Sequence, residues 1–260
     1  MPVHTTDDGC RLSYVMSGHH EAPALVLSNS LGTNHRLWDG QLDRLERLFR
    51  VLRYDTRGHG DSGAPAGDYS LSRLGRDVLS LMDHVAITRA HIGGISLGGI
   101  TALWLAVHAP DRVDRLVLAN TAARIGSTES WGERMQLVTN GGMAAIADAT
   151  MERWFTRRFR EAQPATVAGI RAMLLAVPAT GYLGCCAALR DADLRPRAGQ
   201  VCVPTLVITG THDPATQPED GRWLAGTIPA ATLVEFDAAH LTNVECAAAF
   251  GDALAGFLAS

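Results

Sequence analysis

The chain has 260 residues, of which 47% are hydrophobic, and its formal net charge is −4. This is enough apolar material for one sizeable globular domain, and the weakly acidic balance excludes the basic surface that nucleic-acid-binding proteins use. Every one of the 23 basic residues is arginine, which excludes chemistry that needs a lysine Schiff base.

Three features of the chain bear on its location. The first residues contain neither a basic segment nor an apolar stretch, so we expect no secretion signal. No apolar run approaches the roughly 20 residues that a membrane-spanning helix needs. The five cysteines are odd in number and form no Cys-x-x-Cys pair, which predicts a reduced, cytoplasmic protein with small buried thiols. A redox role for the adjacent Cys185 and Cys186 is the alternative.

Strands and helices alternate along the first part of the chain. Apolar and polar residues alternate over 10–16, which predicts an edge strand, whereas 24–28 is a continuous apolar run typical of strands buried on both faces. The other predicted strands are 51–54, 90–93 and 113–118, and the predicted helices are 38–49, 71–85 and an amphipathic 97–109. This order is typical of a parallel sheet covered by helices on both faces.

The alternation stops at residues 121–200, where the patterns are helical with Gly and Pro interruptions. It resumes with strands predicted at 205–209 and 232–236 and helices at 218–227 and 246–258. We interpret 1–120 and 201–260 as an α/β core and 121–200 as a helical cap over the carboxyl edge of its sheet. The alternative is that these helices only add packing to the core.

The most informative motif is Gly94-Ile95-Ser96-Leu97-Gly98. Gly-x-Ser-x-Gly between a strand and a helix is the nucleophile elbow, a sharp turn that exposes the serine hydroxyl at the edge of the sheet. Small residues are needed two positions to either side, because side chains there would collide with the neighbouring strand and helix. A glycine-rich turn without catalytic function is the alternative.

A serine nucleophile needs a base, and the base needs a carboxylate to orient it. Asp213 and His240 each follow a predicted strand, so both are expected at the carboxyl edge that carries Ser96. Of the ten histidines, only His59 and His240 lie on strand-end loops without another assignment, and His59 is too close to its own strand to reach the serine easily. The order Ser, Asp, His along the chain is that of α/β-hydrolases.

Two backbone amides are expected to form an oxyanion hole. Leu97 follows the nucleophile, and Leu31 lies in the small-residue loop after the 24–28 strand. Asp55 and Arg57 begin a turn that continues to Ser62. We interpret this turn as a brace for the floor of the site, with a direct substrate role as the alternative.

Five segments resemble 3-oxoadipate enol-lactonases, and the likeness runs over nearly the whole chain. They are 28–33, 52–60, 120–126, 210–216 and 237–245. The resemblance implies an α/β-hydrolase fold, with a mostly parallel central sheet covered by helices on both faces and a helical cap. Ser96, Asp213 and His240 match the catalytic triad of that family by position.

The resemblance also implies a reaction. Enzymes of this family open the lactone ring of 3-oxoadipate enol-lactone to give 3-oxoadipate, in the β-ketoadipate branch of bacterial aromatic catabolism. The partner implied is a small anionic substrate, with no cofactor, no metal, no nucleic acid and no membrane. The oligomeric state stays open.

The substrate carries a free carboxylate, for which an arginine under the cap is expected. Arg124 and Arg134 are the candidates, with Trp131 packing on the ring, and the alternative is that these arginines are surface residues. A general carboxylesterase or carbon–carbon bond hydrolase on the same scaffold is the competing function. A catalytically inactive binding module is the competing class, and a dehalogenase is disfavoured because it needs an aspartate in place of Ser96.

Overall fold

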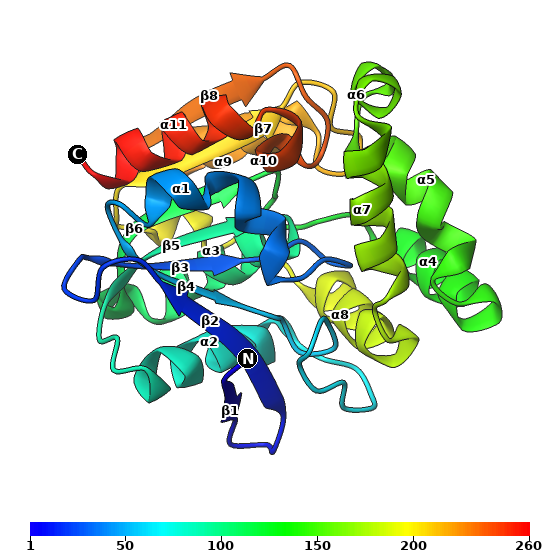
Figure 1. The fold of residues 1–260 in the computed structure, drawn as a ribbon, viewed down its shortest axis with the longest axis horizontal. Helices are drawn as coiled ribbons and strands as arrows, with labels where there is room; N and C mark the ends of the chain where they lie inside the picture. Colours follow the sequence, from blue (N-terminus) through cyan, green and yellow to red (C-terminus); the bar gives the residue numbers. More distant parts are fainter.

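An eight-stranded sheet forms the centre of the protein (Figure 1). The computed structural model describes all residues from Met1 to Ser260. The strand order is β1-β2-β4-β3-β5-β6-β7-β8, in which β1 pairs antiparallel with β2, β2 pairs antiparallel with β4, and the other neighbours are parallel. The strands are β1 (Val3–Thr5), β2 (Arg11–Ser17), β3 (Ala24–Ser28), β4 (Arg50–Tyr54), β5 (Ala90–Ile95), β6 (Val113–Ala119), β7 (Thr205–Gly210) and β8 (Ala231–Phe236). The predicted mostly parallel sheet is confirmed.

The central strands are buried on both faces, as their continuous apolar runs predict. All residues of β5 and β7 are buried, and Leu25, Val26 and Leu27 of β3 are fully inaccessible. Because β3, β5, β6, β7 and β8 run in the same direction, the loops that follow them emerge at one edge of the sheet. Ligands bind at this carboxyl edge in open α/β sheets.

The prediction of an edge strand at 10–16 is wrong in one respect. β2 is the second strand, because β1 pairs outside it with Val3 opposite Ser13. β1 has only three residues, which is too short to give a recognisable alternation in the sequence.

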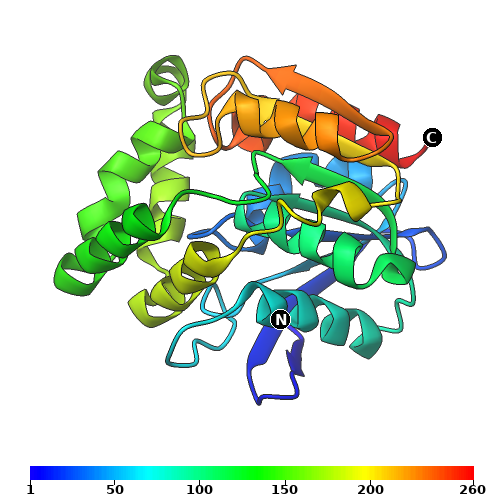
Figure 2. The ribbon, with the colours of Figure 1, turned by 180° about the vertical axis from the view of Figure 1, so that it is seen from behind.

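Helices cover both faces of the sheet. Figures 1 and 2 show the short helix η1 (His35–Gln41), α1 (Leu42–Leu45), α10 (Thr242–Glu245) and α11 (Ala247–Leu258) on one face. The other face carries α2 (Leu71–His84), α3 (Leu97–His108) and α9 (Pro218–Thr227). The short turns η2 (Pro110–Arg112) and η3 (Ala198–Gln200) lie in connections.

Two helices differ from their predictions. The 38–49 helix is a 3₁₀ helix followed by a single α turn, and Gly40 in its middle has low helix propensity. The helix after the serine was expected to be amphipathic, but α3 is buried from Leu97 to Val107. It packs against β3, β5, β6 and α2, so it has no solvent-facing stripe.

Five helices form a separate group beside the carboxyl edge of the sheet (Figure 1). They are α4 (Thr128–Gly141), α5 (Ala144–Trp154), α6 (Arg157–Ala162), α7 (Pro164–Leu175) and α8 (Ala179–Asp191). The chain enters and leaves this group at one place, because the Leu194 amide donates to the Ala123 carbonyl at 2.8 Å.

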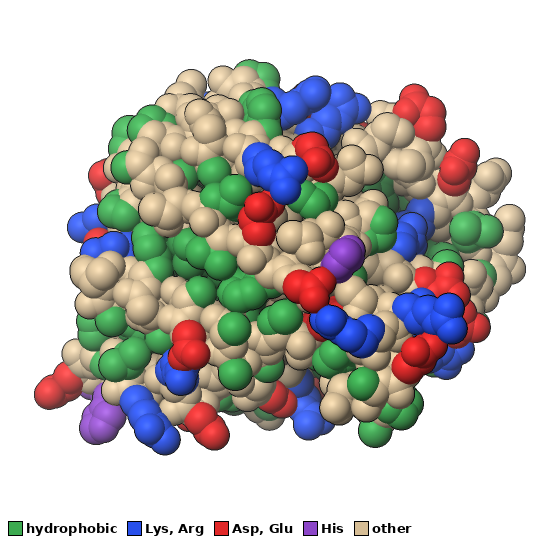
Figure 3. Space-filling view, turned by 90° about the horizontal axis from the view of Figure 1, so that it is seen from above, with side chains coloured by type: hydrophobic (Ala, Val, Ile, Leu, Met, Phe, Trp, Pro, Cys, Tyr) green, Lys and Arg blue, Asp and Glu red, His purple; other side chains and the backbone are tan.

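On the face in Figure 3, arginine and acidic side chains lie side by side in several places. Arg222 forms ion pairs with Glu219 and Glu235. No single helix is long and apolar enough to cross a membrane; α7 and α8 pass that test only as a pair, and the chain bends by 92° between them.

The cysteines agree in part with the expected buried thiols. Cys10, Cys185 and Cys186 are buried, whereas Cys202 is exposed and Cys246 is partly exposed. Burial raises the pKa of both Cys185 and Cys186. Their thiolates are therefore disfavoured, which argues against the redox alternative.

The contact between α2 and α3 generates a stability prediction. A Cβ atom added to Gly75 would overlap the indole ring of Trp104. We expect Gly75→Ala to lower the free energy of unfolding by about 1–2 kcal/mol, because overpacking outweighs the gain of roughly 1 kcal/mol in helix propensity. Urea denaturation measures this change.

The matched control is Gly169→Ala in α7, where an added Cβ meets no atom within 4 Å. This variant should be neutral or more stable by up to about 1 kcal/mol. Equal effects of the two substitutions would contradict the steric explanation.

Candidate active site

The serine turn between β5 and α3 is sterically tight. Ser96 has φ 56° and ψ −116°, a strained conformation for a residue other than glycine. A Cβ on Gly94 would overlap the Gly98 carbonyl at the start of α3, and a Cβ on Gly98 would overlap the Ser28 carbonyl at the end of β3. The predicted collisions with the neighbouring strand and helix are therefore confirmed.

Asp213 lies three residues after β7 and accepts five hydrogen bonds. Its Oδ1 accepts from the amides of Ala215 and Thr216, at 2.8 and 3.1 Å. Its Oδ2 accepts from His240 Nδ1 at 2.8 Å, Thr216 Oγ1 at 2.8 Å and Asn120 Nδ2 at 3.0 Å.

The charge state of Asp213 follows from these partners. Burial alone would raise the pKa of the carboxyl, but the charge of His240 and the hydrogen bonds from His240, Asn120 and Thr216 outweigh it. The pKa is lowered as a result, so the group is an anion that accepts a hydrogen bond from the Nδ1–H of the imidazole.

His240 lies in the loop after β8, and the loop is held on both sides of the histidine. The Ala239 amide donates to Glu245 Oε2 at 3.1 Å, and the Leu241 amide donates to the Trp154 carbonyl at 3.1 Å. Glu245 also accepts from the amide and hydroxyl of Thr156, the N-cap of α6. The backbone around His240 is thus bonded to the helical group as well as to the core.

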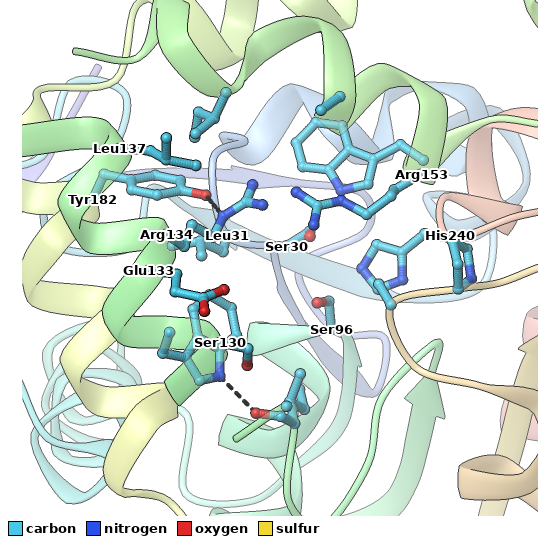
Figure 4. A pocket seen from close by; sticks show the side chains of 18 of the residues that line it. Ser30, Leu31, Ser96, Ser130, Glu133, Arg134, Leu137, Arg153, Tyr182 and His240 are labelled. Carbon is cyan, nitrogen blue, oxygen red and sulfur yellow. Dashed lines mark hydrogen bonds between the residues drawn. The ribbon is translucent and has the colours of Figure 1, made fainter. Parts of the chain in front are cut away.

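Ser96 and His240 line the same cavity, which has a volume of about 430 Å³ (Figure 4). The Ser96 hydroxyl makes no hydrogen bond to the imidazole in this structure. Such contacts are often long in unliganded hydrolases and tighten when substrate binds. The structure therefore brings together Ser96, Asp213 and His240, the three residues that the sequence selected from separate strand ends.

The two predicted oxyanion amides lie at this end of the sheet. Leu97 is the first residue of α3, so no carbonyl of its own helix can reach its N–H. Leu31 lines the cavity, and its N–H makes no hydrogen bond within the chain. It belongs to a tight turn in which the Ser30 carbonyl accepts from the Thr33 amide at 3.2 Å.

Helices α4, α5 and α8 supply most of the remaining cavity wall. The aromatic lining residues are Trp131, Trp154 and Tyr182, and the charged ones are Glu133, Arg134 and Arg153.

The predicted substrate-binding residues have different outcomes. Trp131 and Arg134 line the cavity. Arg134 Nε donates to Tyr182 Oη at 2.6 Å (Figure 4). Its Nη2 donates to Thr150 Oγ1 at 2.9 Å. Arg124, by contrast, is not part of the cavity wall, and its guanidinium lies 3.9 Å from Asp193.

Sequence reasoning missed Arg153, Asn120 and Glu245. Arg153 lines the cavity, points toward its interior in Figure 4, and pairs with no acidic residue. Asn120 is buried directly after β6 with φ 42°, and a position directly after a buried strand is the one signal that could have identified it. Glu245 gave no local signal, since its partners come from elsewhere in the chain.

The turn that begins at Asp55 is a brace, but its two charged residues have separate partners. Asp55 Oδ1 accepts from the amide and Nδ1 of His35, at 2.9 and 2.8 Å. Arg57 forms a buried ion pair with Asp77, at 2.5 and 2.7 Å, and a second one with Asp8. Neither residue lines the cavity, which agrees with the structural interpretation.

Comparison with known proteins gives the class first. Residues 23–246 match the family model of the alpha/beta hydrolase fold. The chain therefore belongs to the α/β-hydrolase family, as the elbow and the order of the three site residues predict.

Individual relatives narrow this class. The chain is 43% identical to 3-oxoadipate enol-lactonase 2 of Acinetobacter baylyi over 94% of its own length and 91% of the relative's. It is 38% identical to 3-oxoadipate enol-lactonase 1 of the same organism over 98% and 96%. The crystal structure of the enol-lactonase from Burkholderia xenovorans superposes with a TM-score of 0.98 at 46% identity, over the whole of both chains. Within its family, the chain groups with the 3-oxoadipate enol-lactonases, as the five resembling segments implied.

The bonds around His240 generate a prediction about its loop. Glu245→Ala leaves the Ala239 amide without its acceptor, and a lost hydrogen bond of this kind is worth about 1–3 kcal/mol. We expect amide exchange at Ala239 to become about tenfold faster or more, measured by hydrogen exchange with NMR detection. Glu129→Ala, at an exposed site on α4, is the control and should leave exchange at Ala239 unchanged. Unaltered exchange at Ala239 in Glu245→Ala would show that the loop is held by other contacts.

Proposed function

We propose that this protein hydrolyses 3-oxoadipate enol-lactone to 3-oxoadipate through an acyl-enzyme on Ser96. The observation that carries the proposal is that His240, which is hydrogen-bonded to Asp213, lines the same cavity as the strained Ser96. The two relatives named for this activity support the choice of substrate. The proposal includes the helical group, residues 121–200, as a cap over the site, with 1–120 and 201–260 as the core, and a cytoplasmic location.

The first step is attack on the lactone carbonyl. His240 Nε2 takes the proton of the Ser96 hydroxyl while the serine oxygen bonds to the carbonyl carbon. The Asp213 carboxylate stabilises the imidazolium that forms. The amides of Leu31 and Leu97 stabilise the negative charge on the carbonyl oxygen, and the loss of one such donor costs on the order of 3 kcal/mol in barrier height.

The ring then opens and the enzyme is regenerated. The bond from the acyl carbon to the ring oxygen breaks, and His240 gives its proton to the departing enol oxygen. An enolate is a better leaving group than an alkoxide, and the free enol tautomerises to the ketone. Water next loses a proton to His240 and attacks the acyl carbon, and Ser96 leaves with that proton to release 3-oxoadipate.

The carboxylate of the substrate needs a cation away from the oxyanion amides. Arg134 is the better candidate, because Tyr182 and Thr150 fix its side chain while Nη1 makes no hydrogen bond within the chain. A fixed guanidinium loses little conformational entropy on binding. Arg153 supplies a second unpaired cation on the cavity wall, and Trp131 can pack on the ring.

The primary test is loss of the ultraviolet absorbance of the enol-lactone with wild type and Ser96→Ala in parallel. We expect the substitution to lower kcat at least 10³-fold, because it removes the nucleophile. A panel of neutral esters separates the competing functions, since a general carboxylesterase would prefer them to the anionic lactone. Failure of an active-site serine probe to label Ser96 would instead favour the non-catalytic binding module.

A second test concerns the carboxylate. Arg134→Gln should raise KM for the lactone about 10- to 100-fold, because a charge-assisted hydrogen bond is worth roughly 1.5–3 kcal/mol, and should leave KM for a neutral ester unchanged. Arg124→Gln is the matched control and should stay within about twofold of wild type. A rise in KM with Arg153→Gln alone would assign the carboxylate to Arg153, and no rise with either variant would place it elsewhere.

A further inference from the structure

His59 is buried beside the candidate oxyanion loop, and the proposed reaction does not use it. It lies in the loop after β4 and is only 1% exposed. Its Nε2 accepts the Gly32 N–H at 2.9 Å, and its Nδ1 lies 3.2 Å from the Arg57 carbonyl oxygen. Both ring nitrogens therefore have protein partners, so His59 cannot serve as a second base.

These two partners fix the protonation state of the imidazole. A carbonyl oxygen only accepts and a backbone N–H only donates, so Nδ1 must carry the proton and Nε2 must be the acceptor. Burial lowers the pKa of His59 to about 4, against smaller raising effects of the Arg57 backbone and Asp55. The ring of His59 is thus neutral around pH 7.

The Gly32 amide belongs to the same turn as the Leu31 amide. Gly32 has φ 84°, and the Ser30 carbonyl closes the turn by accepting from the Thr33 hydroxyl at 2.7 Å as well as from its amide. A Cβ on Gly32 would lie 2.5 Å from Leu174 Cδ1. The loop therefore contacts both His59 and a side chain of α7.

We propose that His59 is a positioning residue for the oxyanion hole, whose neutral imidazole holds the Gly32 amide and thereby fixes the direction of the neighbouring Leu31 N–H. This inference rests on the proposed acyl-transfer chemistry. It makes no claim about which ester or lactone is the substrate. His59 does not touch the reacting atoms; its effect is transmitted through one peptide unit.

The experiment compares His59→Leu, which removes the acceptor, with His59→Gln, whose amide oxygen can accept in place of Nε2. We expect His59→Leu to lower kcat for the enol-lactone about 10- to 100-fold and to leave KM within about twofold of wild type. This fall in kcat is no larger than the fall caused by removing one oxyanion-hole donor completely. A boronic acid that forms a tetrahedral adduct with Ser96 should bind correspondingly more weakly, while affinity for the planar product 3-oxoadipate stays unchanged. His59→Gln should recover most of both losses.

The control is His91→Leu, which removes another buried histidine, in β5, that contacts Phe49 and Asp114 instead of the oxyanion loop. It should leave kcat and boronic acid affinity close to wild type even if it costs stability. A folded His59→Leu with unchanged boronic acid affinity would overturn the proposal, as would equal losses in His59→Leu and His91→Leu.

A second variant and a substrate-independent measurement complete the test. If His59→Leu does not fold, His59→Asn replaces it, because the shorter amide cannot reach Gly32 in the same way; wild-type boronic acid affinity in that variant would overturn the proposal. If wild type does not hydrolyse the enol-lactone, the proposed substrate is wrong. The boronic acid comparison, which needs no natural substrate, then still decides the role of His59.

Discussion

The site depends on how closely three backbone segments meet at the serine turn. The end of β3, the turn itself and the start of α3 pack so tightly that Gly94 and Gly98 leave no room for a Cβ atom. This contact fixes Ser96 in a conformation that an ordinary turn would relax. It also places the Leu97 amide and the loop after β3 on the same side of the sheet as the hydroxyl. The nucleophile and the candidate oxyanion donors are therefore positioned by one steric constraint.

Hydrogen bonds to charged groups position the other functional side chains of the site. Asp213 is buried, yet both oxygens of its carboxylate accept hydrogen bonds, five in all, and this compensates for the loss of water. The imidazole of His240 is thereby fixed by a partner that is itself immobile. Arg134 follows the same rule in the helical group, since Tyr182 and Thr150 hold it before any ligand arrives. Preorganisation of this kind reduces the reorganisation that each chemical step requires.

The sequence predicted those parts of the fold and site that follow from local pattern. Buried strands appear as apolar runs, so the sheet and the residues at its carboxyl edge, Ser96, Asp213 and His240, were accessible to sequence reasoning. Contacts between distant segments were not: Asn120 lies 93 residues from Asp213 in the chain, and Thr156 lies 89 residues from Glu245. Sequence reasoning named Arg124 and missed Arg153, because the pattern of residues 121–200 shows which segments are helical without showing which face of each helix borders a cavity.

The bond from the Leu194 amide to the Ala123 carbonyl closes the helical group at its base. The chain therefore leaves β6 and returns toward β7 at one place, which we call the neck (Ala123 and Leu194). Strands β6 and β7 pair directly in the sheet, and the helical group is inserted between them in the sequence. Helices outside the neck can be lengthened, reordered or exchanged without moving Asn120 or Asp213. Evolution can accordingly vary what this scaffold recognises while Asn120 and Asp213 keep their places, provided that Trp154 and Thr156 keep their bonds to the loop around His240.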